Sequence, residues 1–181
     1  MQAPNDVYSP AEDTFFLEDH ICNLRGSSAL DIGCGSGYLA RRLAKSFDFV
    51  VGTDINLTSL CDAGGWTGDR VCCSGADALS CLFDLIVCNP PYLATDAIED
   101  VATDGGPDGI PVPLQMIRSA VPLLKPGGRL IFVTSSLSDH AGLIKKVQDL
   151  GTRAGILARK KLFFEELILV EARLGENLDR S

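Results

Sequence analysis

Short apolar runs alternate with amphipathic stretches along the chain. The runs are rich in Val, Ile, Leu and Phe and are bounded by turn-forming residues, which is typical of buried strands. The stretches between them repeat apolar residues at helical spacing, which predicts helices. The predicted strands cover residues 28–32, 49–54, 70–74, 82–88, 129–133, 153–158 and 163–170, and the predicted helices cover 10–24, 39–44, 56–60, 113–124 and 138–150.

This order predicts a single α/β domain over residues 1–181. Strands separated by helices form parallel sheets, whereas the last two runs are joined only by residues 159–162 and predict an antiparallel hairpin. We therefore expect a seven-stranded, mostly parallel sheet with a C-terminal antiparallel hairpin. The strand at 70–74 is expected at one edge of the sheet.

The first predicted helix has a well-defined start. Ser9 as N-cap, Pro10 at the first helical position and Glu12 at the third predict a capping box. Tyr8 and Thr14 flank this start, whose positive end suits a carboxylate group.

A glycine-rich turn follows the strand at 28–32. Gly33, Gly35 and Gly37 lead into a helix, which is the first half of a nucleotide-binding unit. Asp31 precedes the first glycine by two residues, and its carboxylate would repel a pyrophosphate but attract an ammonium or sulfonium group. The turn therefore predicts a site for a cationic cofactor.

Asp54 ends the next strand, 21 positions after Gly33. This spacing matches that of a carboxylate that accepts hydrogen bonds from both ribose hydroxyls. The alternative is that Asp54 caps the short helix at 56–60.

The strand at 82–88 ends at Asn89-Pro90-Pro91-Tyr92. Neither proline donates a backbone hydrogen bond, and each forces the preceding residue out of the helical region. The carbonyls of this stretch are therefore free to face a crevice beyond the strand, where open α/β sheets bind ligands. An amide, a carbonyl and an aromatic ring held together in this way can grip a planar NH₂ group by both hydrogens. The alternative is a plain turn after a core strand.

The composition of the chain indicates which kind of molecule it binds and in which cellular compartment it works. The net charge of −8 and pI near 4.7 oppose direct binding to nucleic-acid backbones and favour a protein target. The 7 cysteines contain no C-x-x-C pair, and with no secretory signal they indicate a reducing compartment. No apolar run approaches the ~20 residues that span a bilayer, so no membrane association is expected. These features predict a cytoplasmic protein, with the nucleus as the alternative.

The segment Asn89–Tyr92 resembles the Asn/Asp-Pro-Pro-Tyr motif of class I S-adenosylmethionine methyltransferases that modify planar nitrogens. Residues 8–14 and the Gly-Gly-x-Asp-Gly at 105–109, in an acidic loop over the crevice, are similar to stretches of the HemK-related protein glutamine methyltransferases. The resemblance extends over nearly the whole chain and is strongest to the eukaryotic/archaeal release-factor branch.

This resemblance implies a Rossmann-like class I methyltransferase that uses S-adenosyl-L-methionine and releases S-adenosyl-L-homocysteine. The implied substrate is the glutamine of the Gly-Gly-Gln loop in the class 1 translation release factor. The implied catalytic residues are Asn89, Pro90, Pro91 and Tyr92. The implied cofactor-binding residues are Tyr8, Thr14, Asp31, Gly33, Gly35, Asp54, Ile55, Asp77, Ala78 and Asn89, with Asp77-Ala78 at the position that recognises the adenine amine in this fold.

The same branch works with a small zinc-binding activator protein that pairs with a sheet edge. We expect the segment Arg70–Ser74 to make this contact, by strand addition. The zinc would belong to the activator, because this chain offers no ligand set.

Three alternatives remain at this stage. An N6-adenine methyltransferase of nucleic acids shares the central motif but needs a basic groove, which an acidic chain does not favour. Methylation of a protein lysine would require the amine to be deprotonated first. An inactive scaffold is expected to have lost Asp31, Asp54 or Asn89, and all are present.

Overall fold

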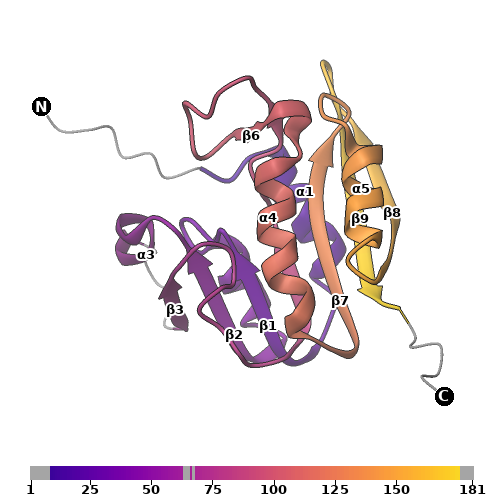
Figure 1. The fold of residues 1–181 in the computed structure, drawn as a ribbon. Coiled ribbons are helices and arrows are strands. Elements are labelled where there is room, and N and C mark those ends of the chain that lie inside the picture. The colour runs from indigo at the N-terminus through magenta and orange to yellow at the C-terminus, as the bar shows by residue number, and fades with distance from the viewer. Residues whose placement is uncertain (1–8, 63–65, 67, 176–181) are drawn as a thin grey trace, which may run out of the picture.

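The computed structural model describes residues 9–62, 66 and 68–175 of the chain. Its main sheet has seven strands in the order β3-β2-β1-β4-β7-β9-β8 (Figure 1). The pairs from β3 to β7 are parallel, and the pairs β7–β9 and β8–β9 are antiparallel. The strands are β1 (Gly26–Ile32), β2 (Phe47–Asp54), β3 (Asp69–Cys72), β4 (Phe83–Cys88), β7 (Leu124–Ser135), β8 (Thr152–Lys161) and β9 (Glu166–Leu174). The predicted sheet and its C-terminal hairpin are confirmed, and β3 lies at the edge as expected.

Helices cover both faces of this sheet. One face packs against α1 (Glu12–Ile21), α2 (Tyr38–Leu43) and α3 (Leu57–Asp62), and the other against α4 (Pro111–Ala120) and α5 (His140–Gln148). The central strands contribute to both cores by alternation: Ile86 and Cys88 of β4 face α4 and α5, while Leu85 and Val87 face α1 and α2. In Figure 1, α4 and α5 lie in front of the sheet and α1 lies behind it.

The order of the strands reverses at β1. The chain runs from β1 outward through β2 to β3, and then returns to place β4 on the other side of β1. The carboxyl ends of β1 and β4 therefore diverge into separate loops, which is where open α/β sheets form ligand crevices.

The first helix begins later than predicted, and the capping box of Ser9 and Glu12 is wrong. Ala11 is the N-cap residue and no side chain caps the helix. The Glu12 carboxylate instead forms an ion pair with Lys160 of β8, at 2.6 Å. The side chain expected to cap its own helix therefore ties that helix to the far hairpin.

Other boundaries moved by a few residues. The helix predicted at 113–124 spans Pro111–Ala120 and continues as the 3₁₀ turn η2 (Val121–Leu123), because Pro122 has no backbone N–H to donate within an α-helix. The C-terminal hairpin turns at residues 162–165 rather than 159–162, because Lys160 and Lys161 still pair with β9. The acidic loop after Tyr92 is partly structured: β5 (Leu93–Ala94) pairs with β6 (Asp104–Gly106), followed by the 3₁₀ turn η1 (Pro107–Gly109).

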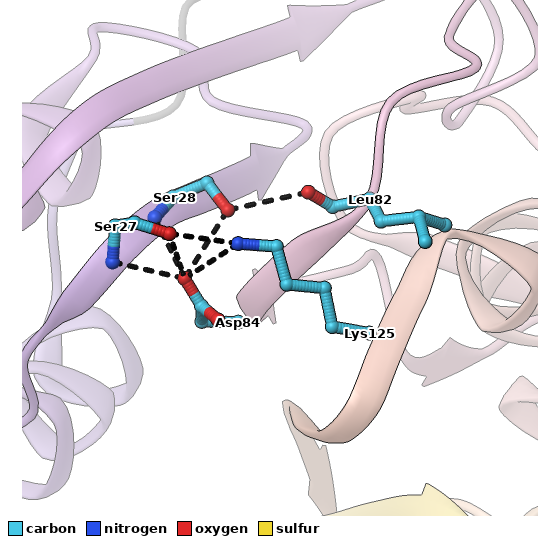
Figure 2. A network of polar contacts seen from close by, with 5 residues as sticks. All are labelled: Ser27, Ser28, Leu82, Asp84 and Lys125. Carbon is cyan, nitrogen blue, oxygen red and sulfur yellow. Dashed lines mark hydrogen bonds and ion pairs between the residues drawn. The ribbon is translucent and has the colours of Figure 1, made fainter.

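A polar network anchors the amino ends of three strands, opposite the crevice. Asp84 of β4 accepts hydrogen bonds from the backbone N–H groups of Ser27 and Ser28, each at 2.9 Å, and from Lys125 Nζ at 3.0 Å (Figure 2). Burial alone would raise the pKa of this carboxyl group, but the hydrogen bonds from Ser27, Lys125 and Ser28 lower it well below its ordinary value. The network therefore joins the starts of β1, β4 and β7 around one carboxylate that stays charged.

No helix in the part of the chain that the structure describes is long and apolar enough to cross a membrane.

Candidate active site

A cavity of about 980 Å³ lies at the carboxyl ends of β1, β2 and β4, beside the point where the strand order reverses. Its volume suits a small-molecule cofactor together with part of a substrate. Its walls come from the glycine turn after β1, the end of β2, the segment Asn89–Tyr92, the start of α1 and the loop at 98–104.

The glycine turn forms one wall of this cavity. Gly33 and Gly35 have φ of +69° and +47°, a region that side chains other than glycine rarely adopt. A Cβ atom at Gly35 would meet nothing within 4 Å, so the backbone borders open space there. The turn thus offers a bare main-chain surface that a flat ligand can approach closely.

Asp31 is almost completely buried in the cavity wall, with a relative exposure of 1%. Its Oδ2 accepts one hydrogen bond, from the backbone N–H of Ala40 at 2.9 Å. Burial raises the pKa of Asp31 to about 7, and the nearby Asp54 charge adds to the rise while the Ala40 bond opposes it. A cation bound beside this carboxyl group would favour its charged form.

Asp54 stands across the turn at the end of β2. Its two carboxylate oxygens accept hydrogen bonds from the backbone N–H groups of Gly35 and Asn56, each at 2.8 Å. These bonds fix the carboxylate and leave further lone pairs for ligand hydroxyls. The alternative of a helix cap is not what the structure has, because the Asn56 side chain caps α3 by accepting from Thr58 N at 2.9 Å. Ile55, the next residue, also lines the cavity and is 64% exposed.

Asn89 directly follows β4 and lines the cavity. Its Nδ2 donates a hydrogen bond to Thr14 Oγ1 of α1, at 3.3 Å. Its Oδ1 is buried and, within the described residues, has no hydrogen-bond partner. A buried amide oxygen without a partner is unfavourable, so this atom is prepared to accept a hydrogen bond from a ligand.

The same turn of α1 holds Tyr92. The Tyr92 hydroxyl donates to Asp13 Oδ2 at 3.2 Å, and Asp13 Oδ1 accepts from the backbone N–H of Thr14 at 2.6 Å. Two consecutive residues of α1 therefore hold both polar ends of the Asn-Pro-Pro-Tyr segment. Sequence reasoning included Asp13 in the motif at 8–14 but gave it no role.

The Gly-Gly-x-Asp-Gly stretch supports this segment from behind. A Cβ atom at Gly109 would lie 2.2 Å from the Tyr92 carbonyl oxygen and 2.5 Å from Ser138 Cβ, and one at Gly105 would lie 3.0 Å from the Pro91 carbonyl oxygen. Only glycine permits such close packing of η1 and β6 against the Pro-Pro-Tyr backbone. These glycines were expected in an acidic loop over the crevice, and their contact with the motif was missed.

Not all predicted site residues come together. Most of them line the same cavity: Thr14, Asp31, Gly33, Gly35, Asp54, Ile55 and Asn89–Tyr92. Tyr8 lies outside the described residues. Asp77 and Ala78 are exposed and do not line the cavity, because the chain turns at Gly75 and closes with a hydrogen bond from Asp77 N to Ser74 O. Ser74 and Gly75 line the cavity in their place. Within the described ranges no group of His, Cys, Asp and Glu side chains could hold a metal ion.

Comparison with known proteins identifies the family to which the chain belongs. Residues 10–164 match the family model described as the methyltransferase small domain. The chain belongs to this family. It is 32% identical over 180 residues to a putative protein N5-glutamine methyltransferase of Methanocaldococcus jannaschii, a match that covers 92% of this chain and 91% of the relative.

A release factor glutamine methyltransferase of Caulobacter vibrioides is 28% identical over 162 residues, which are 71% of this chain. The chain spans about half the length of this bacterial relative, with 53% of it covered. The predicted family, the glutamine methyltransferases related to release-factor enzymes, is thereby confirmed.

Solved structures agree on the fold. The Mtq2–Trm112 complex of E. cuniculi, responsible for methylation of the eRF1 translation termination factor, matches with a TM-score of 0.80 and 25% identity, covering 94% of this chain and 99% of that one. The N-methyltransferase NodS of Bradyrhizobium japonicum, solved with S-adenosyl-L-homocysteine, matches with a TM-score of 0.63 at 18% identity, covering 91% and 86% of the two chains. The class I methyltransferase fold is thereby confirmed.

Proposed function

We propose that this protein transfers a methyl group from S-adenosyl-L-methionine to the side-chain amide nitrogen of a glutamine, in the Gly-Gly-Gln loop of a translation release factor. One observation carries the proposal. Asn89 Oδ1 is a buried hydrogen-bond acceptor without a partner in the described chain, in a cavity that also contains two carboxylates suited to the donor. The methylation of eRF1 by the Mtq2–Trm112 complex supports the choice of substrate.

The cavity fits the methyl donor by its chemistry. The donor carries an ammonium group, a sulfonium group and a ribose, and when bound it supplies an activated methyl group. Asp31 would hold the ammonium group through its charge, and Asp54 would accept hydrogen bonds from the ribose hydroxyls. The bare backbone at Gly33 and Gly35 permits close approach, and Ser74 and Gly75 border the space for the base.

The acceptor nitrogen needs help because an amide shares its lone pair with the carbonyl. If Asn89 Oδ1 and the Pro90 carbonyl accept both N–H bonds, electron density returns to nitrogen as it becomes pyramidal. The Tyr92 ring would pack on the flat amide and fix the face that it presents. The nitrogen then gains the methyl group and loses one proton to water, and positioning supplies much of the acceleration.

Thr14 decides which way the catalytic amide faces. Thr14 Oγ1 donates its own proton to Asp13 Oδ1 at 3.2 Å, so toward Asn89 it can only accept, from Nδ2, which leaves Asn89 Oδ1 as the free end. If the amide were flipped, the donor NH₂ group would face the substrate NH₂ group and neither could accept. The hydrogen bond to α1 therefore selects the only useful orientation.

We further propose that a small zinc-binding activator pairs with the edge strand β3, as strand addition requires. β3 pairs with β2 on one side only, and Asp69, Arg70 and Cys72 on it are exposed. The presence of Trm112 in the Mtq2 complex supports a partner of this kind. A translation factor as substrate favours a cytoplasmic location.

The test is transfer of labelled methyl groups to release factor, with the activator present and absent. A release factor whose Gly-Gly-Gln glutamine is changed to alanine should accept no label. Nucleic acid and a lysine-containing protein serve as rival acceptors. Labelling of either rival in preference to the glutamine would overturn the proposal.

Asn89→Ala should lower kcat by ~10²–10³, the scale of one hydrogen bond made in the transition state, and change donor affinity little. Asn23→Ala, at an exposed asparagine in the turn after α1, is the matched control and should leave kcat unchanged. Full turnover in a folded Asn89→Ala variant would remove this residue from the mechanism.

A further inference from the structure

The turn between β8 and β9 carries the two most exposed large hydrophobic side chains of the described chain. Phe163 is 91% and Phe164 is 85% exposed, while the next, Val101, is 65% exposed. The two rings pack edge to face with centroids 4.6 Å apart. Paired aromatic rings in water are unusual on a protein surface without a partner, and they mark an interaction site.

The backbone under these rings is firmly held. Leu162 N donates to Glu165 O at 2.8 Å within the turn, and the Glu165 carboxylate accepts from the Ser135 hydroxyl group. Ser136 and Glu166 exchange two further hydrogen bonds, each at 2.9 Å. The rings therefore stand on a turn that is fixed to the end of β7, which reduces the entropy lost when a partner binds.

This turn borders the candidate active site. Glu165, next to Phe164, is one of the residues that line the cavity. β7 runs parallel to β4, with Phe132 beside Cys88, so the end of β7 lies on the same side of the sheet as Asn89. Figure 1 shows the tip of the β8–β9 hairpin and the loop around β6 rising together beyond this end of the sheet.

A third exposed apolar side chain comes from the neighbouring loop. Leu137 is 52% exposed, and its backbone N–H donates to Ser135 Oγ at 3.1 Å, the same hydroxyl that contacts Glu165. We call Leu137, Phe163 and Phe164 the rim patch. Of the basic residues beside the patch, Arg159 and Lys160 form ion pairs with Glu166 and Glu12, and Lys161 is exposed. The rim patch therefore presents three apolar side chains with one positive charge at its edge, which fits an apolar surface better than a basic one.

We propose that the rim patch docks the folded substrate protein, by contact with an apolar surface beside the loop that delivers the glutamine. This inference rests on the proposed function and names how that substrate is recognised. The activator is not the expected occupant, because β3 and the β8–β9 hairpin lie at opposite edges of the sheet. The patch adds affinity for the whole protein and takes no part in the chemistry.

The test compares a folded substrate with a short one. The double variant Phe163→Ser/Phe164→Ser, in complex with the activator, is assayed on intact release factor and on a short peptide containing Gly-Gly-Gln. We expect KM for the intact protein to rise at least about tenfold, the range for loss of an aromatic anchor. Turnover of the peptide, kcat at saturating protein and donor affinity should be unchanged. Leu82→Ser is the matched control, since Leu82 is 45% exposed just before β4. This variant should change neither KM nor kcat for either substrate.

Each other result overturns the inference in a distinct way. An unchanged KM for the intact protein would show that the rim patch does not dock it. An equal loss with protein and peptide would show that the turn shapes the catalytic site instead. Weaker activator binding would assign the patch to that protein. If the wild-type complex transferred no methyl group to release factor, the proposed function would fail, and this inference with it.

Discussion

We expect the buried carboxyl group of Asp31 to make binding of the methyl donor depend on pH. In the donor-free protein its pKa is raised to about 7, mainly by burial. A bound ammonium group stabilises the carboxylate, so binding below pH 7 must release the proton that Asp31 holds. Affinity should therefore be highest at about pH 7–8, where Asp31 is ionised and the α-amino group of the donor still carries much of its charge, and it should fall as the pH is lowered.

The magnitude follows from the linkage. When one proton is released on binding, the dissociation constant rises about tenfold for each pH unit below the free pKa, which is about 1.36 kcal/mol per unit. Relative to the affinity well above pH 7, the loss at pH 5 approaches ~100-fold. Between pH 7, where half of the Asp31 carboxyl groups already carry a proton, and pH 5 the loss is therefore about 50-fold, and it levels off only below the pKa of the complex. An α-amino group, with a pKa near ~7.7–8.0, stays charged throughout this range and adds no proton of its own.

Calorimetry with S-adenosyl-L-homocysteine between pH 5 and pH 7 would measure the dissociation constant and the number of protons released on binding. Repeating the titration in buffers of different ionisation enthalpy counts the protons, and close to one should be released at pH 6. Asp31→Asn should bind more weakly and nearly independently of pH, while Asp48→Asn, at an exposed position early in β2, should behave as the wild type. A wild-type affinity that stays constant from pH 7 to pH 5 would refute the reasoning.

Asp31 affects the stability of the donor-free fold in the opposite direction: stability falls as the pH rises, whereas donor affinity increases. Because the folded pKa lies above the ordinary 3.8, the folded state holds the extra proton, and its stabilising effect is lost as the pH rises from about 4 to about 7. The ionised side chain then costs the donor-free fold up to about 4 kcal/mol, so Asp31→Asn should raise Tm at pH 8.

Three further changes test the rest of the site. Thr14→Val should lower kcat about 3–10-fold by releasing the Asn89 amide, as expected for one net hydrogen bond, whereas Thr14→Ser should restore it; equal kcat in both would exclude the orienting role. Asp54→Ala should weaken donor binding by about 1.5–3 kcal/mol, measured by calorimetry, through loss of charge-assisted bonds. Gly109→Ala should lower both Tm and kcat, because its Cβ would meet the Pro-Pro-Tyr backbone at 2.2 Å. Gly127→Ala carries a similar positive φ with nothing within 4 Å, so it should lower Tm less and leave kcat unchanged.

Local patterns were enough to predict the framework. The apolar run before Asn89, the glycine turn and the strand ending at Asp54 each carry their signal within a few residues, and parallel pairing then brings their ends to one edge of the sheet. The fold class follows from these three stretches, and the methyltransferase family follows from the resemblance at residues 8–14, 89–92 and 105–109. Both are confirmed.

Contacts between distant segments could not be predicted in this way. Glu12 looks like a local cap but pairs with Lys160, 148 positions away, because tertiary packing brings β8 to the start of α1. Asp13 and Thr14 reach the Asn-Pro-Pro-Tyr segment 79 and 75 positions along the chain, and no spacing rule reports such a bond. Asp77 was expected in the cofactor site but lies outside the cavity for a related reason: a glycine turn after β3 directs the next residues away from it.

Strand β4 has the Asp84 hydrogen-bond network at its start and the candidate catalytic residue Asn89 directly after its end. Asp84 is tied to β1 and β7 at its start, and Asn89 follows its last residue, about 17 Å further on at ~3.3 Å per residue. Because the anchor lies in this short strand and the Asn89 amide directly follows it, the amide is held by the sheet rather than by a long loop. Changes in the length or sequence of the loops around the crevice should therefore leave the depth of the amide unchanged.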